Sequence, residues 1–273
     1  MTVNIDNHQP DSDAVLYHKD QRGVVTITLN RPDKHNAFDD AIIAQLTALF
    51  KQAAGDPQAR VVVLKATGKS FCAGADVNWM KRMANYSYEQ NLADANALAN
   101  MLHTLYTLPK PTIAKVQGAA FGGAVGLVAC CDIAVASRLS KFCLSEVKLG
   151  LIPATISPYV IAAMGERVAR RYFMTAEVFS AHRARRLGLL SEAVTEEDLE
   201  STINDLISHI LNNGPLAVSA AKQLVFDVKN QPLSDELIEK TSLCIATTRI
   251  SQEGQEGLSA FLEKRTPAWR NNV

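Results

Sequence analysis

The stretch GAAFGGAVGLVACCD, residues 118–132, follows the strand-like run from Thr112 to Val116. Its glycines, small apolar residues and closing carboxylate predict a strand, a tight turn and a buried helix. The first amides of such a helix lack intrahelical acceptors, so they are suited to stabilise negative charge. The alternative is that Gly122, Gly123 and Gly126 serve only the close packing of a buried helix.

A second glycine turn favours the functional interpretation. The stretch SFCAGAD, residues 70–76, follows a predicted strand from Val61 to Lys65 and also places small residues at a turn. Two such turns can direct one backbone N–H each at the same oxygen. An oxyanion hole requires such a pair of amides, aimed at a carbonyl that becomes an anion.

Composition bounds the class of protein. The 273 residues are 47% hydrophobic and 21% charged, and the formal charge is +0, so no global field favours nucleic acid or an anionic membrane. Arginines cluster only locally, in patterns typical of solvated helix faces: Arg167, Arg170, Arg171, Arg183, Arg185 and Arg186. We therefore expect no nucleic-acid partner.

The cysteines and the N-terminal residues indicate a compartment. The five cysteines have no metal-type spacing and are expected to be reduced thiols. Met1 to Asp13 has neither the basic-then-apolar order of a secretory signal nor the composition of a transit peptide, and we expect a loose leader there. No apolar run reaches membrane-spanning length. The sequence thus predicts a soluble, cytoplasmic protein without membrane contact.

The order of elements indicates an α/β protein. Val15–Tyr17 and Val24–Leu29 alternate like a hairpin around Gly23, and helices are expected from Asp39 and from about Glu89 to Leu108. Between them, Val77–Tyr88 has weak periodicity and is predicted to be mobile or to face a ligand. From Ser157 onward the chain is expected to be almost wholly helical. This pattern alone is also compatible with an ordinary doubly wound sheet.

The combination of motifs resembles the crotonase (enoyl-CoA hydratase/isomerase) superfamily. The resemblance rests on the two glycine turns, on Asn30-Arg31-Pro32 and on LSEVKLGLIP at residues 144–153, and it runs from Val15 to the C-terminus. It implies a spiral of ββα repeats with the acyl-CoA site in residues 1–200. Residues 201–273 would form a helical trimerisation region, with trimers pairing as hexamers.

The resemblance also implies roles for individual residues. The amides of Ala75 and Gly123 would form the oxyanion hole for a thioester carbonyl. Contacts to coenzyme A would come from Lys34, Ala37, Ala73, Asp76, Val77 and Gly122, with Lys264 a weaker candidate for the nucleotide phosphates, supplied by a neighbouring subunit. Coenzyme A is then part of the substrate, and neither a separate cofactor nor a metal is expected.

Glu146 is the expected catalytic acid–base group. Hydratases of the superfamily often use two glutamates, and Glu146 matches the second position. Gly126 stands at the first, so one carboxylate is absent. This departure puts the two-glutamate addition of water in doubt and leaves a Δ3,Δ2-enoyl-CoA isomerase as a rival, since one glutamate suffices to move a proton between two carbons.

A further departure narrows the predicted substrate. The run PATISPY at residues 153–159 replaces a glycine-rich segment, and together with Gly126 it is similar to bacterial 3-methylglutaconyl-CoA hydratases of leucine degradation and to isohexenylglutaconyl-CoA hydratases. Ser157 and Thr155 either orient water or cap the next helix and turn the chain into it. Asp132 is expected to be structural.

An RNA-binding protein on the same fold is a rival interpretation of the whole chain. Two features argue against it: the charge is balanced, and no basic stripe interleaved with aromatic residues is present in the sequence.

A glutaconyl thioester has a second carboxylate, for which the sequence offers several cations. Burying an anion is costly unless a cation or several donors meet it. The nearest candidates are Lys81, Arg82 and Lys148. On a predicted strand, Lys148 would share a face with Glu146, although a structural ion pair is the other interpretation of this lysine.

Overall fold

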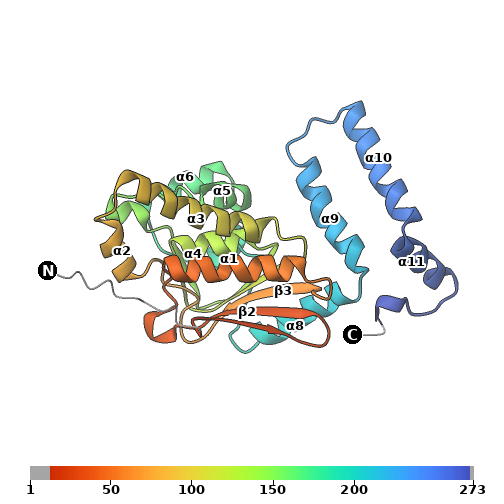
Figure 1. Ribbon diagram of the computed structural model, residues 1–273, viewed down its shortest axis with the longest axis horizontal. Coiled ribbons are helices and arrows are strands. Elements are labelled where there is room, and N and C mark those ends of the chain that lie inside the picture. Colours follow the sequence, from red (N-terminus) through yellow and green to blue (C-terminus); the bar gives the residue numbers. More distant parts are fainter. Residues whose placement is uncertain (1–12, 271–273) are drawn as a thin grey trace, which may run out of the picture.

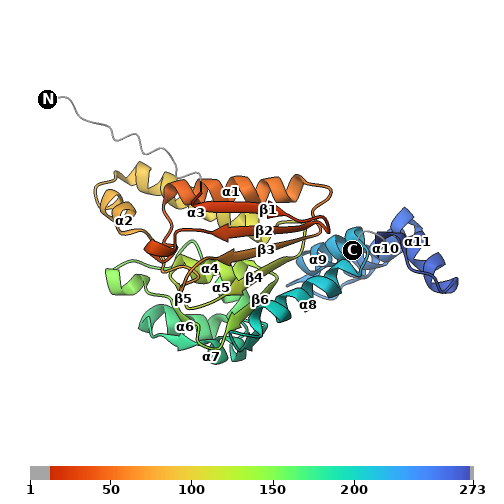
Figure 2. The ribbon, with the colours of Figure 1, turned by 90° about the horizontal axis from the view of Figure 1, so that it is seen from below.

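The computed structural model describes residues 13–270, and its main sheet has the strand order β1-β2-β3-β4-β6-β9 (Figures 1 and 2). The strands are β1 (Val15–Lys19), β2 (Val24–Leu29), β3 (Val61–Ala66), β4 (Thr112–Val116), β6 (Ile133–Ser137) and β9 (Glu192–Val194). β1 pairs antiparallel with β2, and the later neighbours are parallel. The predicted hairpin is confirmed, whereas the predicted leader at residues 1–12 lies outside the described residues.

A second, smaller sheet gives the chain its spiral. It has the order β5-β7-β8 and consists of β5 (Ala119–Phe121), β7 (Lys141–Cys143) and β8 (Phe179–Ser180). The strand β4 of the main sheet is followed by β5 of the small sheet and then by a helix. In the same way, β6 of the main sheet is followed by β7 of the small sheet and then by a helix. This ββα repeat confirms the crotonase-like α/β spiral and excludes the ordinary doubly wound alternative.

Helices cover both faces of the main sheet. The chain forms α1 (Asp40–Gly55), α2 (Val77–Met83), α3 (Tyr88–Tyr106), α4 (Gly123–Cys130), α5 (Ser157–Met164), α6 (Glu166–Thr175), α7 (Ala181–Arg186) and α8 (Leu199–Leu211), together with the short 3-10 helices η1 (Pro32–Lys34), η2 (Glu146–Leu149) and η3 (Ala268–Arg270). α1 packs against α3 over one face, while α8 contacts β3, β4 and β6 on the other (Figure 2). The two faces therefore have separate apolar clusters.

α4 is the buried helix that the opening stretch predicts. Every residue from Ala124 to Cys130 is buried, which explains why the segment is apolar on all sides rather than amphipathic. α4 contacts α3 and α5. Since its surroundings are fixed by packing, its first residue, Gly123, has a fixed position as well.

The segment after Asp76 is more regular than its weak periodicity suggests. Its first part, Val77–Met83, forms the helix α2, and a mobile or ligand-facing role for Val77–Tyr88 stays a prediction. Asp76 caps it by accepting a hydrogen bond from the Asn78 amide, and Trp79 is buried with its indole N–H donating to Asp94 at 3.0 Å. One buried aromatic and a cap thus order a turn whose periodicity is weak.

The C-terminal helices extend away from the sheets. They are α9 (Pro215–Val228), α10 (Asp235–Ile250) and α11 (Gln252–Leu262), of which Figures 1 and 2 show α10 and α11 farthest from β2 and β3. No residue of α9 or α10 is buried. The predicted boundary between residues 200 and 201 falls inside α8, whose Ile203, Ile207 and Leu211 are buried against the sheet. The prediction of near-complete helicity after Ser157 overlooked β8 and β9, which add edge strands to the two sheets.

Candidate active site

The two glycine turns lie against each other. The Cys72 amide donates to the Ala119 carbonyl at 3.0 Å, and the Phe121 amide donates to the Cys72 carbonyl at 3.1 Å. Gly74, at φ +104°, approaches so closely that a Cβ there would lie 3.3 Å from the Phe121 oxygen. Backbone pairing therefore unites two turns that are almost 50 positions apart in the sequence, as the two-amide hypothesis requires.

The amides of Ala75 and Gly123 are both available. Neither donates a hydrogen bond to an acceptor within the described part of the chain. Gly122, the N-cap of α4, has φ +55° and ψ −126°, a conformation that strongly favours glycine. A Cβ on Gly123 would lie 2.5 Å from the Phe38 ring, so glycine at this position lets the helix start sit directly on that ring. The turn and the ring fix the direction of the Gly123 N–H.

Glu146 reaches the same turn from η2. Its Oε1 lies 3.4 Å from the position that a Cβ on Gly122 would occupy. Its Oε2 is buried and has no hydrogen-bond partner among residues 13–270. Burial raises the pKa of this carboxyl above 4.5, and the hydrogen bond from the Glu146 amide offsets only part of the effect. A carboxyl with a raised pKa beside unpaired amides is suited to exchange a proton with a bound thioester.

The sequence pattern of the enoyl-CoA hydratase/isomerase family matches residues 19–272. The chain belongs to this family. Since the family consists of enzymes and the two turns and Glu146 converge, the expectation of an enzyme of the crotonase superfamily is confirmed.

Similar proteins agree with this assignment over most of their length. A crotonase structure from Legionella pneumophila is 49% identical, with a TM-score of 0.91 over 94% of this chain and 99% of that chain. An enoyl-CoA hydratase structure from Shewanella pealeana is 46% identical, with a TM-score of 0.90 over 94% and 96% of the two chains. The 2,3-dehydroadipyl-CoA hydratase of Escherichia coli is 32% identical over 92% of this chain and 96% of its own length.

Gly126, where many members of the family have a glutamate, has no room for one. A Cβ there would lie 2.3 Å from Cγ2 of Ile156, at the start of α5, and 3.5 Å from a methyl of Leu102 in α3. Ile156 is 1% exposed. The absent carboxylate is therefore replaced by apolar packing, and Glu146 has no acidic partner from α4. Ile156 was missed from the sequence, because nothing in the pattern connects it with Gly126.

The predicted coenzyme A residues gather around one loop. Phe38 donates to the Gly74 carbonyl at 3.0 Å, and Ala73 donates to the His35 carbonyl at 3.0 Å, so the loop carrying Lys34 and Ala37 runs beside the Ala75 turn. Ala73 and Val77 are exposed on the same turn. The structure thus brings Lys34, Ala37, Ala73, Asp76 and Val77 together, next to Gly122.

Arg31 holds this loop in place. Its guanidinium lies 3.2 Å from Asp39 and 3.2 Å from Asp76, the N-caps of α1 and α2, and it donates to the Ala37 carbonyl at 3.3 Å. The Asp76 carboxylate is thus occupied by Arg31 and by the Asn78 amide. Because both carboxylate oxygens of Asp76 have partners, a contact of this residue with coenzyme A would be made by its backbone. The sequence contained Asn30-Arg31-Pro32 as a signal but gave no indication of this ion-pair pattern.

The predicted geometry of Lys148 is wrong. Residues 146–149 form the 3-10 helix η2 instead of a strand, and two positions apart on a helix of three residues per turn do not share a face. Lys148 is exposed. Arg82 is also committed elsewhere, since it forms an ion pair with Asp40. Lys81, exposed on α2, forms no salt bridge with any residue from 13 to 270.

Lys264 is not brought to the other candidates. It lies two residues after the end of α11, which is at the end of the molecule opposite α2 (Figure 1). Within one chain, Lys264 and the other coenzyme A candidates therefore lie apart.

Two polar residues have structural partners, as expected. Asp132 accepts from the amide and the hydroxyl of Thr112, at 2.8 and 2.9 Å, and pairs with Lys222 at 2.7 Å. The Ser157 hydroxyl donates to the Ala154 carbonyl at 2.7 Å, which makes it a turn residue. The five cysteines are free thiols. The structure thus gives both Asp132 and Ser157 a structural role.

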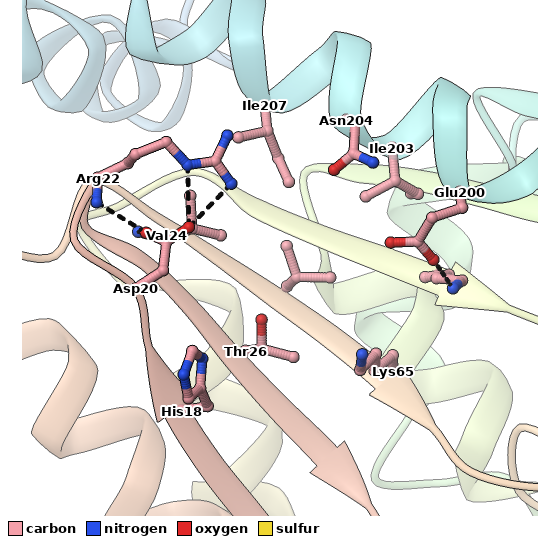
Figure 3. Close-up of a pocket in the computed structure, with 12 residues that line it drawn as sticks. His18, Asp20, Arg22, Val24, Thr26, Lys65, Glu200, Ile203, Asn204 and Ile207 are labelled. Atoms are coloured by element: carbon pink, nitrogen blue, oxygen red, sulfur yellow. Dashed lines mark hydrogen bonds and ion pairs between the residues drawn. The ribbon is translucent and has the colours of Figure 1, made fainter. Parts of the chain in front are cut away.

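A hollow of about 170 Å³ lies on the opposite face of the main sheet, between the strands and α8 (Figure 3). Four of its charged residues form ion pairs: Asp20 binds Arg22 at 2.8 Å, and Glu200 binds Lys115. The hollow shares no residue with the site around Glu146.

No cluster of metal-binding side chains occurs among residues 13–270, and no helix in that range is both long and apolar enough to cross a membrane.

Proposed function

We propose that this enzyme hydrates 3-methylglutaconyl-CoA to 3-hydroxy-3-methylglutaryl-CoA, a step of leucine degradation. The observation that carries the proposal is the carboxylate oxygen of Glu146 that has no hydrogen-bond partner among residues 13–270. The Glu146 side chain lies beside the glycine turn at which the Gly123 N–H is free. This arrangement pairs a proton acceptor with donors for the thioester oxygen.

The proposed reaction uses only groups of this site and water. Glu146 takes a proton from water as the water oxygen forms a bond to the β-carbon. The π electrons of the double bond move into the thioester, and the amides of Ala75 and Gly123 donate hydrogen bonds to the resulting enolate oxygen. Protonated Glu146 then returns the proton to the α-carbon, so that one water is added and the carboxylate is restored. No separate cofactor takes part in this scheme.

The substrate class is supported by the sequence and by one relative. The segment from Pro153 to Tyr159 resembles 3-methylglutaconyl-CoA hydratases, and the Escherichia coli relative is named for a dehydroadipyl thioester, which also has a distal carboxylate. Isohexenylglutaconyl-CoA is the alternative substrate with the same glutaconyl group. Lys81, with no salt bridge inside residues 13–270, is the best remaining cation for the distal carboxylate.

A comparison of substrates tests this proposal. We expect kcat/KM for 3-methylglutaconyl-CoA to exceed that for uncharged 3-methylcrotonyl-CoA. We also expect Lys81→Ala to lower the former alone, by the equivalent of about 2–5 kcal/mol if the pair is buried upon binding. Arg82→Ala is the matched control, because its charge is already paired with Asp40. Equal activity on both thioesters would contradict the glutaconyl assignment.

The isomerase is a second candidate because Ile156 removes the space for a second carboxylate. It predicts migration of the double bond in 3-enoyl-CoA without uptake of water. Incubation in ¹⁸O-labelled water separates the candidates, since only hydration incorporates the label into the product.

The proposed assembly is a homotrimer or homohexamer built through residues 201–273. It is supported by an apolar groove of about 880 Å³ among α9, α10 and α11. In such an assembly, Lys264 of a neighbouring copy is a candidate to bind the nucleotide phosphates. A cytoplasmic location also stays a prediction.

A further inference from the structure

Ser145 occupies a position where serine normally caps a helix, but it does not cap one. It is the N-cap of η2, and its side chain makes no capping hydrogen bond. No hydrogen bond of its hydroxyl to another group is found within the part of the chain that the structure describes. Since serine is favoured at N-caps because its oxygen accepts such a bond, an unused hydroxyl calls for another partner.

The hydroxyl is located beside the candidate acid–base group. The point where a Cβ on Gly122 would lie is 3.4 Å from Glu146 Oε1 and 3.8 Å from Ser145 Oγ. The side of Gly122 on which another residue would carry its Cβ therefore faces one carboxylate and one hydroxyl. Gly123, whose N–H is free, is the next residue.

A water that attacks an alkene needs more than a base. Glu146 accepts one of its protons, but a second hydrogen bond is required to fix the direction of the oxygen lone pair. Gly126 and Ile156 leave no carboxylate on α4 for this purpose. Oε2 of Glu146 is buried without a partner, so the site has unused hydrogen-bonding capacity on the carboxylate as well.

We propose that the Ser145 hydroxyl is the second hydrogen-bond partner of the attacking water, in place of the carboxylate that position 126 lacks. This inference rests on the proposed hydration. The Ser145 hydroxyl oxygen accepts a hydrogen bond from the O–H of water that Glu146 does not deprotonate, and no proton is transferred to or from the serine. The overall step still adds OH to the β-carbon and H to the α-carbon.

The test compares two reactions of the same site. Hydration of 3-methylglutaconyl-CoA and of crotonyl-CoA needs the oriented water, whereas exchange of the α-protons of butanoyl-CoA with deuterium oxide needs only Glu146 and the two amides. We expect Ser145→Ala to lower kcat for hydration by roughly 10- to 100-fold and to leave the exchange rate within about twofold of wild type. Ser145→Thr, which retains a hydroxyl, should restore most of the hydration rate.

Controls separate this inference from folding and from the proposed function. Ser157→Ala removes a hydroxyl that is bonded to Ala154 and should leave both reactions unchanged. Equal loss of hydration and exchange in Ser145→Ala, or loss of neither, would overturn the role of Ser145. If the wild-type enzyme exchanges protons but hydrates no enoyl thioester, the hydratase proposal itself fails and the inference fails with it.

Discussion

Glu146 combines features that stability alone does not favour. Its carboxylate is mostly buried, one oxygen has no partner within residues 13–270, and burial raises its pKa. The sequence predicted the residue through the family resemblance. It did not predict the 3-10 helix that turns Lys148 away from Glu146, because four residues ending at a glycine contain too little periodicity to distinguish a turn from a strand.

The raised pKa predicts a pH-dependent stability difference between wild type and Glu146→Gln. In the folded state Glu146 binds its proton more tightly than in the unfolded chain, where the pKa is near 4.5. Its contribution to stability is therefore fully present below pH 4.5 and is lost as pH rises through the folded pKa. We expect Glu146→Gln to gain stability over wild type at pH 8, with a smaller difference at pH 4.

Urea unfolding at the two pH values measures this difference. Glu177→Gln is a control with the opposite shift, because its hydrogen bond from Arg171 lowers the pKa of the Glu177 carboxyl. A pH-independent difference for Glu146→Gln would contradict a raised pKa.

At the scale of elements, the site depends on how α4 meets α3, α5 and the two turns. The sequence predicted a buried helix after a glycine turn, and the residues 118–132 form it, preceded by the short strand β5. The contact of Gly126 with Ile156 could not be predicted, since a close approach between two helices 30 positions apart depends on the tertiary packing. The same applies to Arg31, whose two ion pairs join the starts of α1 and α2.

A double-mutant cycle tests the packing of α4 against α5. Gly126→Ala places a methyl 2.3 Å from the Ile156 side chain and should cost about 1–3 kcal/mol of unfolding free energy. Ile156→Ala should cost about 2–5 kcal/mol, because it leaves a cavity. The double variant should lose less than the sum, since the new methyl enters the space that Ile156 vacates. Additive losses in urea titrations would show that the two positions do not contact each other.

At the scale of the whole molecule, the apolar core lies in the two sheets and α1 to α8, whereas many large apolar side chains of the C-terminal helices are exposed. Leu243 is 66% exposed, Ile250 79% and Phe261 81%. Large apolar side chains at this density mark an interaction surface. The sequence predicted that this part of the chain is helical. It gave no sign of how far α9 to α11 extend from the sheets, because that arrangement depends on contacts beyond each helix.

We expect the full chain to assemble through this surface. Leu243→Glu places a charge in the groove among α9, α10 and α11 and should shift the protein toward the monomer in light scattering coupled to size-exclusion chromatography. Leu139→Glu, in the exposed turn between β6 and β7, is the matched control and should retain the wild-type mass. A monomeric wild type across micromolar concentrations would contradict the assembly.

The most direct test of the central claim is the turnover of Glu146→Gln. The substitution keeps the shape of the side chain and removes its proton acceptor, while the Ala75 and Gly123 amides remain. We predict that kcat for hydration falls by about 100- to 10,000-fold, the range that acid–base catalysis contributes, and that the affinity for a saturated acyl-CoA stays within a few-fold of wild type. A variant that keeps more than about a tenth of the wild-type kcat would contradict the assignment of Glu146 as the acid–base group.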